Sequence, residues 1–187
     1  MITLGIDPGT LIAGYGVIET LGAGSGKLRV LEYGEIHMSN TASLSMRLCA
    51  LYEKLAAVIE RTVPDECAVE SAFYHKNIQS TLKIGHARGV ALLAAAQKQI
   101  PVSEYSPREI KKAITGSGAA SKEQVQFMVC AILKIKQTSK FFDASDALAV
   151  AVCHQQRRSS PRLTARNWKE YIEAHPEKVV VGAKSKR

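Results

Sequence analysis

The chain has 187 residues, of which 46% are hydrophobic, and it carries a net charge of +8. This length favours one domain with an appended segment. The longest uninterrupted apolar runs, Val90–Ala96 and Ala147–Cys153, fall far short of the roughly 20 residues that cross a membrane. No basic stretch precedes an apolar segment at the N-terminus, so we expect no signal peptide, no membrane partner and a cytoplasmic location.

The positive charge is unevenly distributed. Residues 155–187 carry nine Lys or Arg against three Glu, which is +6 of the total of +8. A second basic stretch lies between Lys76 and Lys122, where eight basic residues stand against Glu104 and Glu109. Such patches are typical of proteins with a polyanionic partner, although charge that serves only solubility gives the same pattern.

Three β-rich stretches come first in the chain: Ile2–Asp7, Tyr15–Thr20 and Lys27–His37. The connections between them are short, which favours antiparallel pairing. A helix is expected from about Ser43 to Arg61, because apolar residues recur along it at steps of four and three. Pro64 ends this helix.

In the second half, short strands alternate with helices. The expected strands are Cys67–Ser71 and Pro101–Tyr105, and the expected helices cover about Asn77–Gln99, Ser106–Thr115, Ser121–Lys134 and Phe142–Gln156. Ser106-Pro107 and Ser121-Lys-Glu-Gln124 are patterns that cap the start of a helix. The order β-β-β-α-β-α-β-α-α-α predicts an α/β fold in which a mixed five-stranded sheet is flanked by helices.

We expect a folded domain over residues 1–156 and a basic, partly disordered extension over residues 157–187. Within the extension, Trp168, Tyr171 and Ile172 would form the apolar side of one short helix over Thr164–His175. The cysteines form no C-x-x-C pair and the histidines no i,i+4 pair, so a zinc site is not expected. The cysteines are predicted to be small buried thiols.

Four acidic residues stand in unusual positions. Asp7 and Glu70 each end an apolar strand, while Asp143 and Asp146 lie one turn apart on an alanine-rich helix. Each alone has an ordinary explanation: Asp7 could cap its turn, and Asp143 could interact with the helix dipole. If the strands that end in Asp7 and Glu70 are parallel neighbours, however, the carboxylates would converge at one edge of the sheet.

Converging carboxylates raise one another's pKa values unless a cation joins them. Mg²⁺ prefers oxygen ligands and retains water molecules in its coordination shell. Two such ions about 4 Å apart can activate water and stabilise the leaving oxygen of a phosphodiester. The acidic residues are therefore consistent with metal-dependent phosphodiester hydrolysis, although their spacing alone does not establish it.

Longer motifs in the chain resemble one family. GIDPGT, GYGVIE, VESAFYHKNIQSTLKIGHARGVALLAA, EYSPREIKKAITGSGAASKEQVQ and DASDALAVAVCH occur in the order found in the bacterial RuvC family of Holliday-junction resolvases, from about Met1 to His154. The resemblance implies an RNase H-like fold, a homodimer, and symmetric nicking of two opposite strands of a four-way junction during recombination and repair. It also implies two Mg²⁺ ions per subunit, with Mn²⁺ as a substitute, and the branch-migration proteins RuvA and RuvB as partners.

Carried over residue by residue, the family's catalytic and metal-holding acids fall on Asp7, Glu70, Asp143 and Asp146. The family also places a DNA-contacting aromatic residue three positions after its glutamate, which is Phe73 here; without the resemblance, a core aromatic would be the preferred interpretation. Lys76 lies in the same expected surface loop. The family's DNA-facing lysines correspond to Lys111 and Lys122, which could otherwise be solvated surface charge. The basic segment 155–187 matches none of these motifs.

Other functions share parts of the pattern. Gly5-Ile-Asp-Pro-Gly-Thr10 is similar to the first phosphate loop of sugar kinases and actin-like ATPases, but two nucleotide-clasping domains do not fit into 187 residues. An RNase H-like nuclease acting on ribosomal RNA precursors has a similar opening but lacks the later motifs. A non-enzymatic junction-binding protein would need no acidic quartet. We therefore predict a Mg²⁺-dependent, structure-selective endonuclease that resolves four-way DNA junctions.

Overall fold

A computed structural model describes residues 1–22, 26–71, 78–136, 142–159 and 172. The chain divides into two compact units, Met1–Arg157 and Arg158–Arg187, and the sheet belongs entirely to the first unit. Phe73 and Lys76 lie outside the described residues, as does the helix expected around Trp168. In the part of the chain that is described, no helix has the length and apolar character needed to cross a membrane.

The sheet has five strands in the order β3-β2-β1-β4-β5, which confirms the predicted mixed sheet. The strands are β1 (Ile2–Asp7), β2 (Ile12–Leu21), β3 (Lys27–His37), β4 (Glu66–Glu70) and β5 (Val102–Tyr105). The first three pair antiparallel, whereas β4 runs parallel to both β1 and β5. Two central parallel strands, β1 and β4, therefore bring their C-terminal ends to the same edge of the sheet.

Five helices are found among the described residues: α1 (Leu44–Thr62), α2 (Ile78–Gln97), α3 (Pro107–Thr115), α4 (Lys122–Leu133) and α5 (Phe142–Ser159). Ser43 caps α1, and the boxes Ser106–Glu109 and Ser121–Gln124 cap α3 and α4. At these positions side-chain oxygens accept hydrogen bonds from the free amides of the first turn. Gly116 ends α3 with φ of 79°, a conformation that suits glycine.

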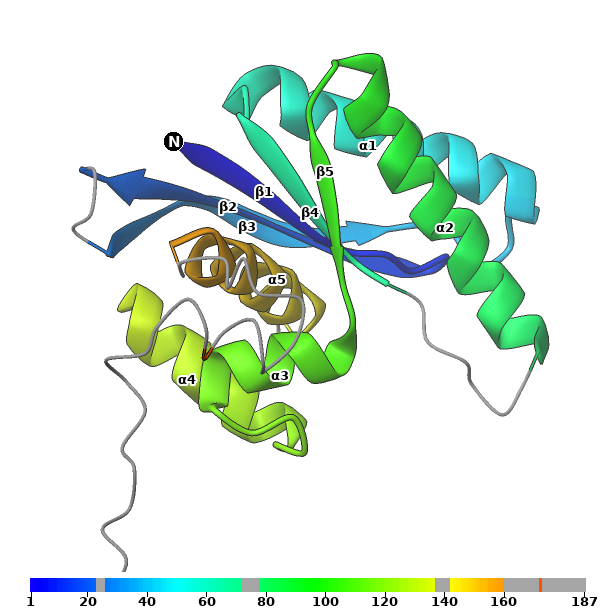
Figure 1. Cartoon of the computed structure of the whole chain (residues 1–187). Helices are drawn as coiled ribbons and strands as arrows, with labels where there is room; N and C mark the ends of the chain where they lie inside the picture. Colours follow the sequence, from blue (N-terminus) through cyan, green and yellow to red (C-terminus); the bar gives the residue numbers. More distant parts are fainter. Residues whose placement is uncertain (23–25, 72–77, 137–141, 160–171, 173–187) are drawn as a thin grey trace, which may run out of the picture. The chain divides into compact units, whose positions relative to one another are not determined.

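The helices form a layer on each face of the sheet (Figure 1). Helices α1 and α2 pack on the face from which Leu4, Ile6 and Val69 project. Helices α3, α4 and α5 cover the opposite face, in a core that includes Ile18 and Ala68. This two-core arrangement follows from the alternation of side chains along each strand, since successive residues point to opposite faces.

Helix α5 lies against glycines of the central strands. A Cβ atom on Gly5 would lie 2.1 Å from the carbonyl oxygen of Ala147, and one on Gly14 would lie 1.8 Å from that of Asp143. Both distances are far shorter than real contacts, so no larger residue fits without moving α5. The glycines thus allow the helix backbone to approach the sheet backbone directly.

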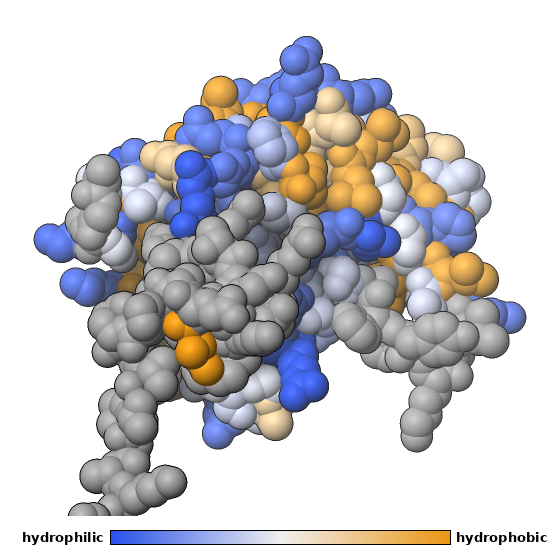
Figure 2. Space-filling model, viewed as in Figure 1, coloured by the Kyte–Doolittle hydropathy of each residue, from blue (hydrophilic) through white to orange (hydrophobic). Residues whose placement is uncertain are grey.

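Helix α2 leaves an apolar strip on the surface. Leu82 is 59% exposed and Leu93 is 51% exposed, and hydrophobic residues gather over this helix in Figure 2. Between them, Cβ atoms built on Gly85 and Gly89 would meet nothing within 4 Å. The strip is therefore an open helix face with small residues at its middle.

The predicted state of the cysteines is correct for three of the four. Cys67, Cys130 and Cys153 are buried free thiols, whereas Cys49 is exposed on α1. Cys49 lies in an amphipathic helix whose buried face carries Leu51, Leu55, Val58 and Ile59, so its position on the helix leaves it on the solvent side.

Candidate active site

Strand alternation directs the acidic side chains of β1 and β4 to the same face. On β1, Thr3, Gly5 and Asp7 face α5, while Leu4 and Ile6 enter the opposite core. On β4, Ala68 lies in the α5 core and Glu70 lines a cavity on that side. Because Ile6 pairs with Val69 in parallel register, Asp7 and Glu70 end adjacent strands at one edge of the sheet.

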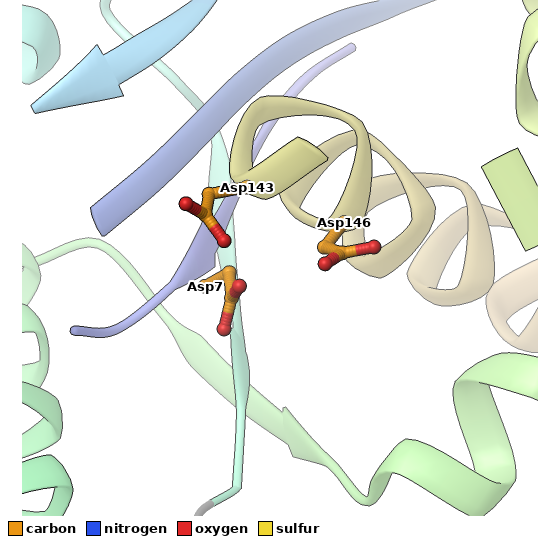
Figure 3. A group of neighbouring side chains, drawn as sticks. All are labelled: Asp7, Asp143 and Asp146. Carbon is orange, nitrogen blue, oxygen red and sulfur yellow. The ribbon is translucent and has the colours of Figure 1, made fainter. Parts of the chain in front are cut away.

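Helix α5 brings the other two acids to this edge. One carboxylate oxygen from each of Asp7, Asp143 and Asp146 lies within 4.8 Å of the others, and Figure 3 shows these side chains grouped where β1 and α5 meet. Glu70 is not within this group of three. It borders the group, since it lines a cavity together with Asp146 and ends the strand next to that of Asp7.

Burial and mutual repulsion disfavour the charged forms of these acids. Burial raises the pKa of Asp7 to about 7, and the charges of Asp146 and Asp143 act in the same direction. Burial also raises the pKa of Glu70 to about 8, with Asp7 and Asp146 adding to the shift. The pKa of Asp146 is raised as well, mainly by burial and against the pull of Lys122. Burial and the neighbouring carboxylates therefore oppose ionisation of these acids, and Lys122 offsets only part of that effect.

Two lysines lie beside the cluster. The ammonium group of Lys122 lies 2.7 Å from Oδ2 of Asp146, and its nitrogen lies 5.5 Å from the centre of the Phe142 ring. Lys111 and Lys122 line a cavity of about 180 Å³ together with Glu70, Asp146, Pro107, Ile110, Val125 and Ala149. Both predicted lysines thus stand at the acidic site, and Lys122 has a carboxylate partner that sequence reasoning did not anticipate.

The donor set suits a hard divalent cation. It consists of carboxylate oxygens alone, with no sulfur or imidazole in the group found among the described residues. Oxygen ligands are those that Mg²⁺ and Mn²⁺ prefer, whereas structural zinc sites use thiolates and imidazoles. A cation in this position would also offset the burial and the repulsion that raise the pKa values of Asp7 and Glu70.

Buried polar contacts fix the far half of α5. The Tyr105 hydroxyl lies 2.8 Å from Nδ1 of His154, whose Nε2 lies 2.5 Å from a carboxylate oxygen of Glu66. Gln155 donates a hydrogen bond to the hydroxyl of Thr3. These contacts tie α5 to β1, β4 and β5. Thr3 and Glu66 lie side by side toward the starts of their strands, away from the acids, whereas Tyr105 pairs with Glu70 at the acidic end. Sequence reasoning assigned His154 no role, because its partners are distant in the chain.

Two further features escaped sequence reasoning. Phe142 immediately precedes Asp143, but its contact with Lys122 joins segments 20 positions apart. Gly14 is part of the GYGVIE motif, yet its closeness to the backbone of Asp143 emerges only from the packing of α5. The motif itself was the available signal, since a glycine within a strand often marks the close approach of another backbone.

The strand order, with α5 laid across β1 and β2, is that of the RNase H-like fold, here bearing a carboxylate cluster at the edge of its central parallel strands. The family model for crossover junction endodeoxyribonuclease RuvC matches residues 3–154. The chain therefore belongs to the RuvC family of crossover junction endodeoxyribonucleases.

Individual relatives agree with this assignment. The RuvC protein of Cytophaga hutchinsonii is 43% identical over 178 residues, covering 95% of this chain and 88% of the relative. That of Desulforamulus reducens is 48% identical over 160 residues, covering 86% and 96%. Among solved structures, Thermus thermophilus RuvC in complex with a Holliday junction substrate superposes with a TM-score of 0.78 at 33% identity, covering 84% of this chain and 94% of that one.

Proposed function

We propose that this chain is a structure-selective endonuclease that resolves four-way (Holliday) DNA junctions by nicking two opposite strands symmetrically. The observation that carries the proposal is the convergence of three carboxylates within 4.8 Å at the edge of an RNase H-like sheet. Membership of the crossover junction endodeoxyribonuclease family supports it, as does the T. thermophilus relative solved with a Holliday junction substrate.

Asp7, Glu70, Asp143 and Asp146 are proposed to hold two Mg²⁺ ions, with Mn²⁺ able to replace them. When bound, such ions supply an activated water and stabilise the charge that develops on the leaving oxygen. The protein contributes rigid placement. Asp7 and Glu70 are fixed by the parallel pairing of β1 and β4, while Asp143 and Asp146 are fixed by the packing of α5 on glycines.

Lys111 and Lys122 are proposed to orient the DNA backbone at this site. Both side chains line the cavity that also contains Glu70 and Asp146, so an ammonium group can neutralise a phosphate next to the carboxylates. Phe73 and Lys76, which follow β4 shortly after Glu70 but lie outside the described residues, are proposed to contact DNA near the crossover. The segment's position in the chain, just after Glu70, supports this assignment.

A homodimer is proposed to place two such sites on the junction. A two-fold symmetric substrate presents two equivalent cleavage points, which a two-fold symmetric protein can match. The exposed strip of α2, with Leu82 and Leu93 on either side of Gly85 and Gly89, is the surface we propose for this contact. We also propose a cytoplasmic location and RuvA and RuvB as partners in branch migration.

The proposal is tested with a synthetic four-way junction, a linear duplex of the same sequence and a structured RNA, each incubated with Mg²⁺. Symmetric nicks in the junction alone are the expected result. Asp7→Asn and Asp146→Asn should abolish cleavage while retaining junction binding, because loss of a carboxylate removes a metal ligand but leaves the lysines in place. Cleavage of the RNA in preference to the junction, or normal cleavage by both variants, would contradict the proposal.

A further inference from the structure

The ammonium group of Lys122 is held between two side chains of one turn of α5. On one side is the Asp146 carboxylate, 2.7 Å away. On the other is the face of the Phe142 ring, with its centre 5.5 Å away. Phe142 and Asp146 are four positions apart on the helix and therefore project on the same side. The lysine comes from the first residue of α4, so this contact joins the two helices beside the acidic cluster.

Phe142 does not act as a core residue in this position. Its side chain is 41% exposed, and it is absent from both hydrophobic clusters of the described residues. A ring that is 41% exposed gains less from burial than the fully buried side chains of the two cores do. Its contact with the Lys122 ammonium gives it a different role, because the negative face of an aromatic ring attracts a cation within about 6 Å.

We propose that Phe142 is a positioning residue that keeps the Lys122 ammonium beside the acidic cluster when a divalent cation occupies the Asp146 carboxylate. This inference rests on the proposed function, in which Asp146 holds metal and Lys122 contacts a phosphate. A dication bound to Asp146 repels the Lys122 ammonium. It also occupies the carboxylate with which this ammonium forms its ion pair. The Phe142 ring carries no formal charge for the dication to neutralise, so the ring can still bind the Lys122 ammonium.

The lysine stem suits such an exchange. Lys has a compact charge on four flexible carbons and can turn from one partner to another without backbone movement. Without an aromatic ring, an ammonium released from Asp146 would be free to move into water, because the Lys122 side chain is 47% exposed. With the ring, it stays at the cavity where the phosphate is expected.

The test measures affinity of the full chain for a synthetic four-way junction by fluorescence anisotropy, both in EDTA and with Ca²⁺, a hard oxygen-binding dication. The variants are Phe142→Leu, Phe142→Tyr, Lys122→Met and the double variant Phe142→Leu/Lys122→Met. Phe127→Leu is the matched control, since Phe127 is a 61% exposed ring on α4. Melting temperatures of all variants are measured in the same buffers.

With Ca²⁺, Phe142→Leu should weaken junction binding about two- to fivefold, the size of an exposed cation–π contact. The effect should be smaller in EDTA, where Asp146 still holds the ammonium. Phe142→Tyr should bind like the parent because it keeps the ring face, and Phe127→Leu should also be unchanged. In the Lys122→Met background, Phe142→Leu should have no further effect.

Three results would overturn the inference. If Lys122→Met weakens binding but the two substitutions act additively, the ring does not work through Lys122, and the proposed function stands. If Phe142→Leu lowers the melting temperature by many degrees, the ring is a packing residue. If Lys122→Met leaves junction affinity unchanged, the DNA-contacting role of Lys122 in the proposed function fails, and the inference fails with it.

Discussion

Protonation of a single residue, Asp7, links the acidic cluster to the stability of the metal-free chain. Burial and the charges of Asp146 and Asp143 raise its pKa to about 7, against about 4 for an aspartate in an unfolded chain. Between about pH 4 and about pH 7 the unfolded chain has released this proton while the folded chain retains it. The free energy of unfolding therefore falls as pH rises through this window and levels off above it.

We expect Asp7→Asn to remove part of this pH dependence, because asparagine does not titrate. In EDTA, its melting temperature should exceed that of the parent at about pH 8, and the difference should shrink toward about pH 5. Differential scanning fluorimetry across this range gives the measurement. Glu60→Gln, which changes an exposed carboxylate paired with Lys98, serves as the control. A parent chain that gains stability as pH rises would contradict the raised pKa of Asp7.

At the scale of the elements, the seating of α5 on Gly14 sets the distance between Asp143 and Asp7. A Cβ atom at Gly14 would lie 1.8 Å from the Asp143 carbonyl oxygen, so Gly14→Ala must push the start of α5 outward. We expect this variant to lose roughly 1–3 kcal/mol of stability, as overpacked sites do. It should also show a smaller Mg²⁺-induced rise in melting temperature and poor cleavage.

Gly16→Ala is the matched control for Gly14→Ala. Its Cβ would meet the side chain of Leu148, at 2.7 Å, and the Leu148 amide nitrogen at 3.0 Å, at a part of α5 beyond the acids. It should cost stability but keep most of the Mg²⁺ response, since a leucine side chain can shift. Equal loss of the Mg²⁺ response in both variants would show that α5 moves as a whole. Gly14 would then not be the residue that sets the position of Asp143 relative to Asp7.

The exposed face of α2 gives the third prediction. Leu93→Glu puts a charge on the proposed dimer surface, where Leu93 is 51% exposed in the single chain. We expect a monomer with a nearly unchanged melting temperature and much reduced junction cleavage. Sedimentation analysis reports the mass, and Leu31→Glu on β3, at a leucine that is 40% exposed, is the control. If the Leu93→Glu variant is still a dimer, the dimer interface does not lie on this face of α2.

Helix ends were the most predictable elements, because their chemistry is local. Ser106 and Ser121 cap α3 and α4 as their sequence patterns indicate. The start of β2 was predicted too late: Ile12, Ala13 and Gly14 extend it by pairing with His37, Ile36 and Glu35 of β3. Glycine and alanine favour strands weakly, so only the long-range pairing reveals this extension.

The acids of the site were predictable for a related reason. Each interrupts an apolar pattern, and the motifs of the family fixed their identity as candidates. The convergence of these acids depends on the parallel register of β1 and β4. The sequence gives only indirect evidence for that pairing, namely that strands and helices alternate along this part of the chain. The contact of Lys122 with Asp146 and Phe142 could not be predicted, because the packing of α4 beside α5 has no local signature.

At the scale of the whole molecule, the basic C-terminal segment gives the fourth prediction. Truncation after Ser159 removes seven Lys or Arg and three Glu but leaves α5 complete. If the segment attracts DNA through its charge, the truncated chain should bind all DNA more weakly at low salt. The slope of log affinity against log salt should become shallower by about 0.9 per lost phosphate contact.

The preference for junction over duplex should survive this truncation, because the proposed site and the proposed dimer surface lie within residues 1–157. Affinities for both DNAs over a salt series, together with melting curves, give the measurement. The competing prediction is that Trp168, Tyr171 and Ile172 form a helix that stabilises the fold. A melting temperature lowered by several degrees with an unchanged salt slope would favour that alternative.

The carboxylate cluster joins residues that are made far apart in time. Asp7 and Asp146 are 139 positions apart, and ribosomes add about 5–20 residues per second, so on the order of 10 s passes between their synthesis. During that interval α5 has not been synthesised and cannot pack on β1, so neither Asp143 nor Asp146 lies beside Asp7. A chain whose translation stops before α5 is equally incomplete. The growing chain therefore lacks its proposed active site until its first unit is nearly complete.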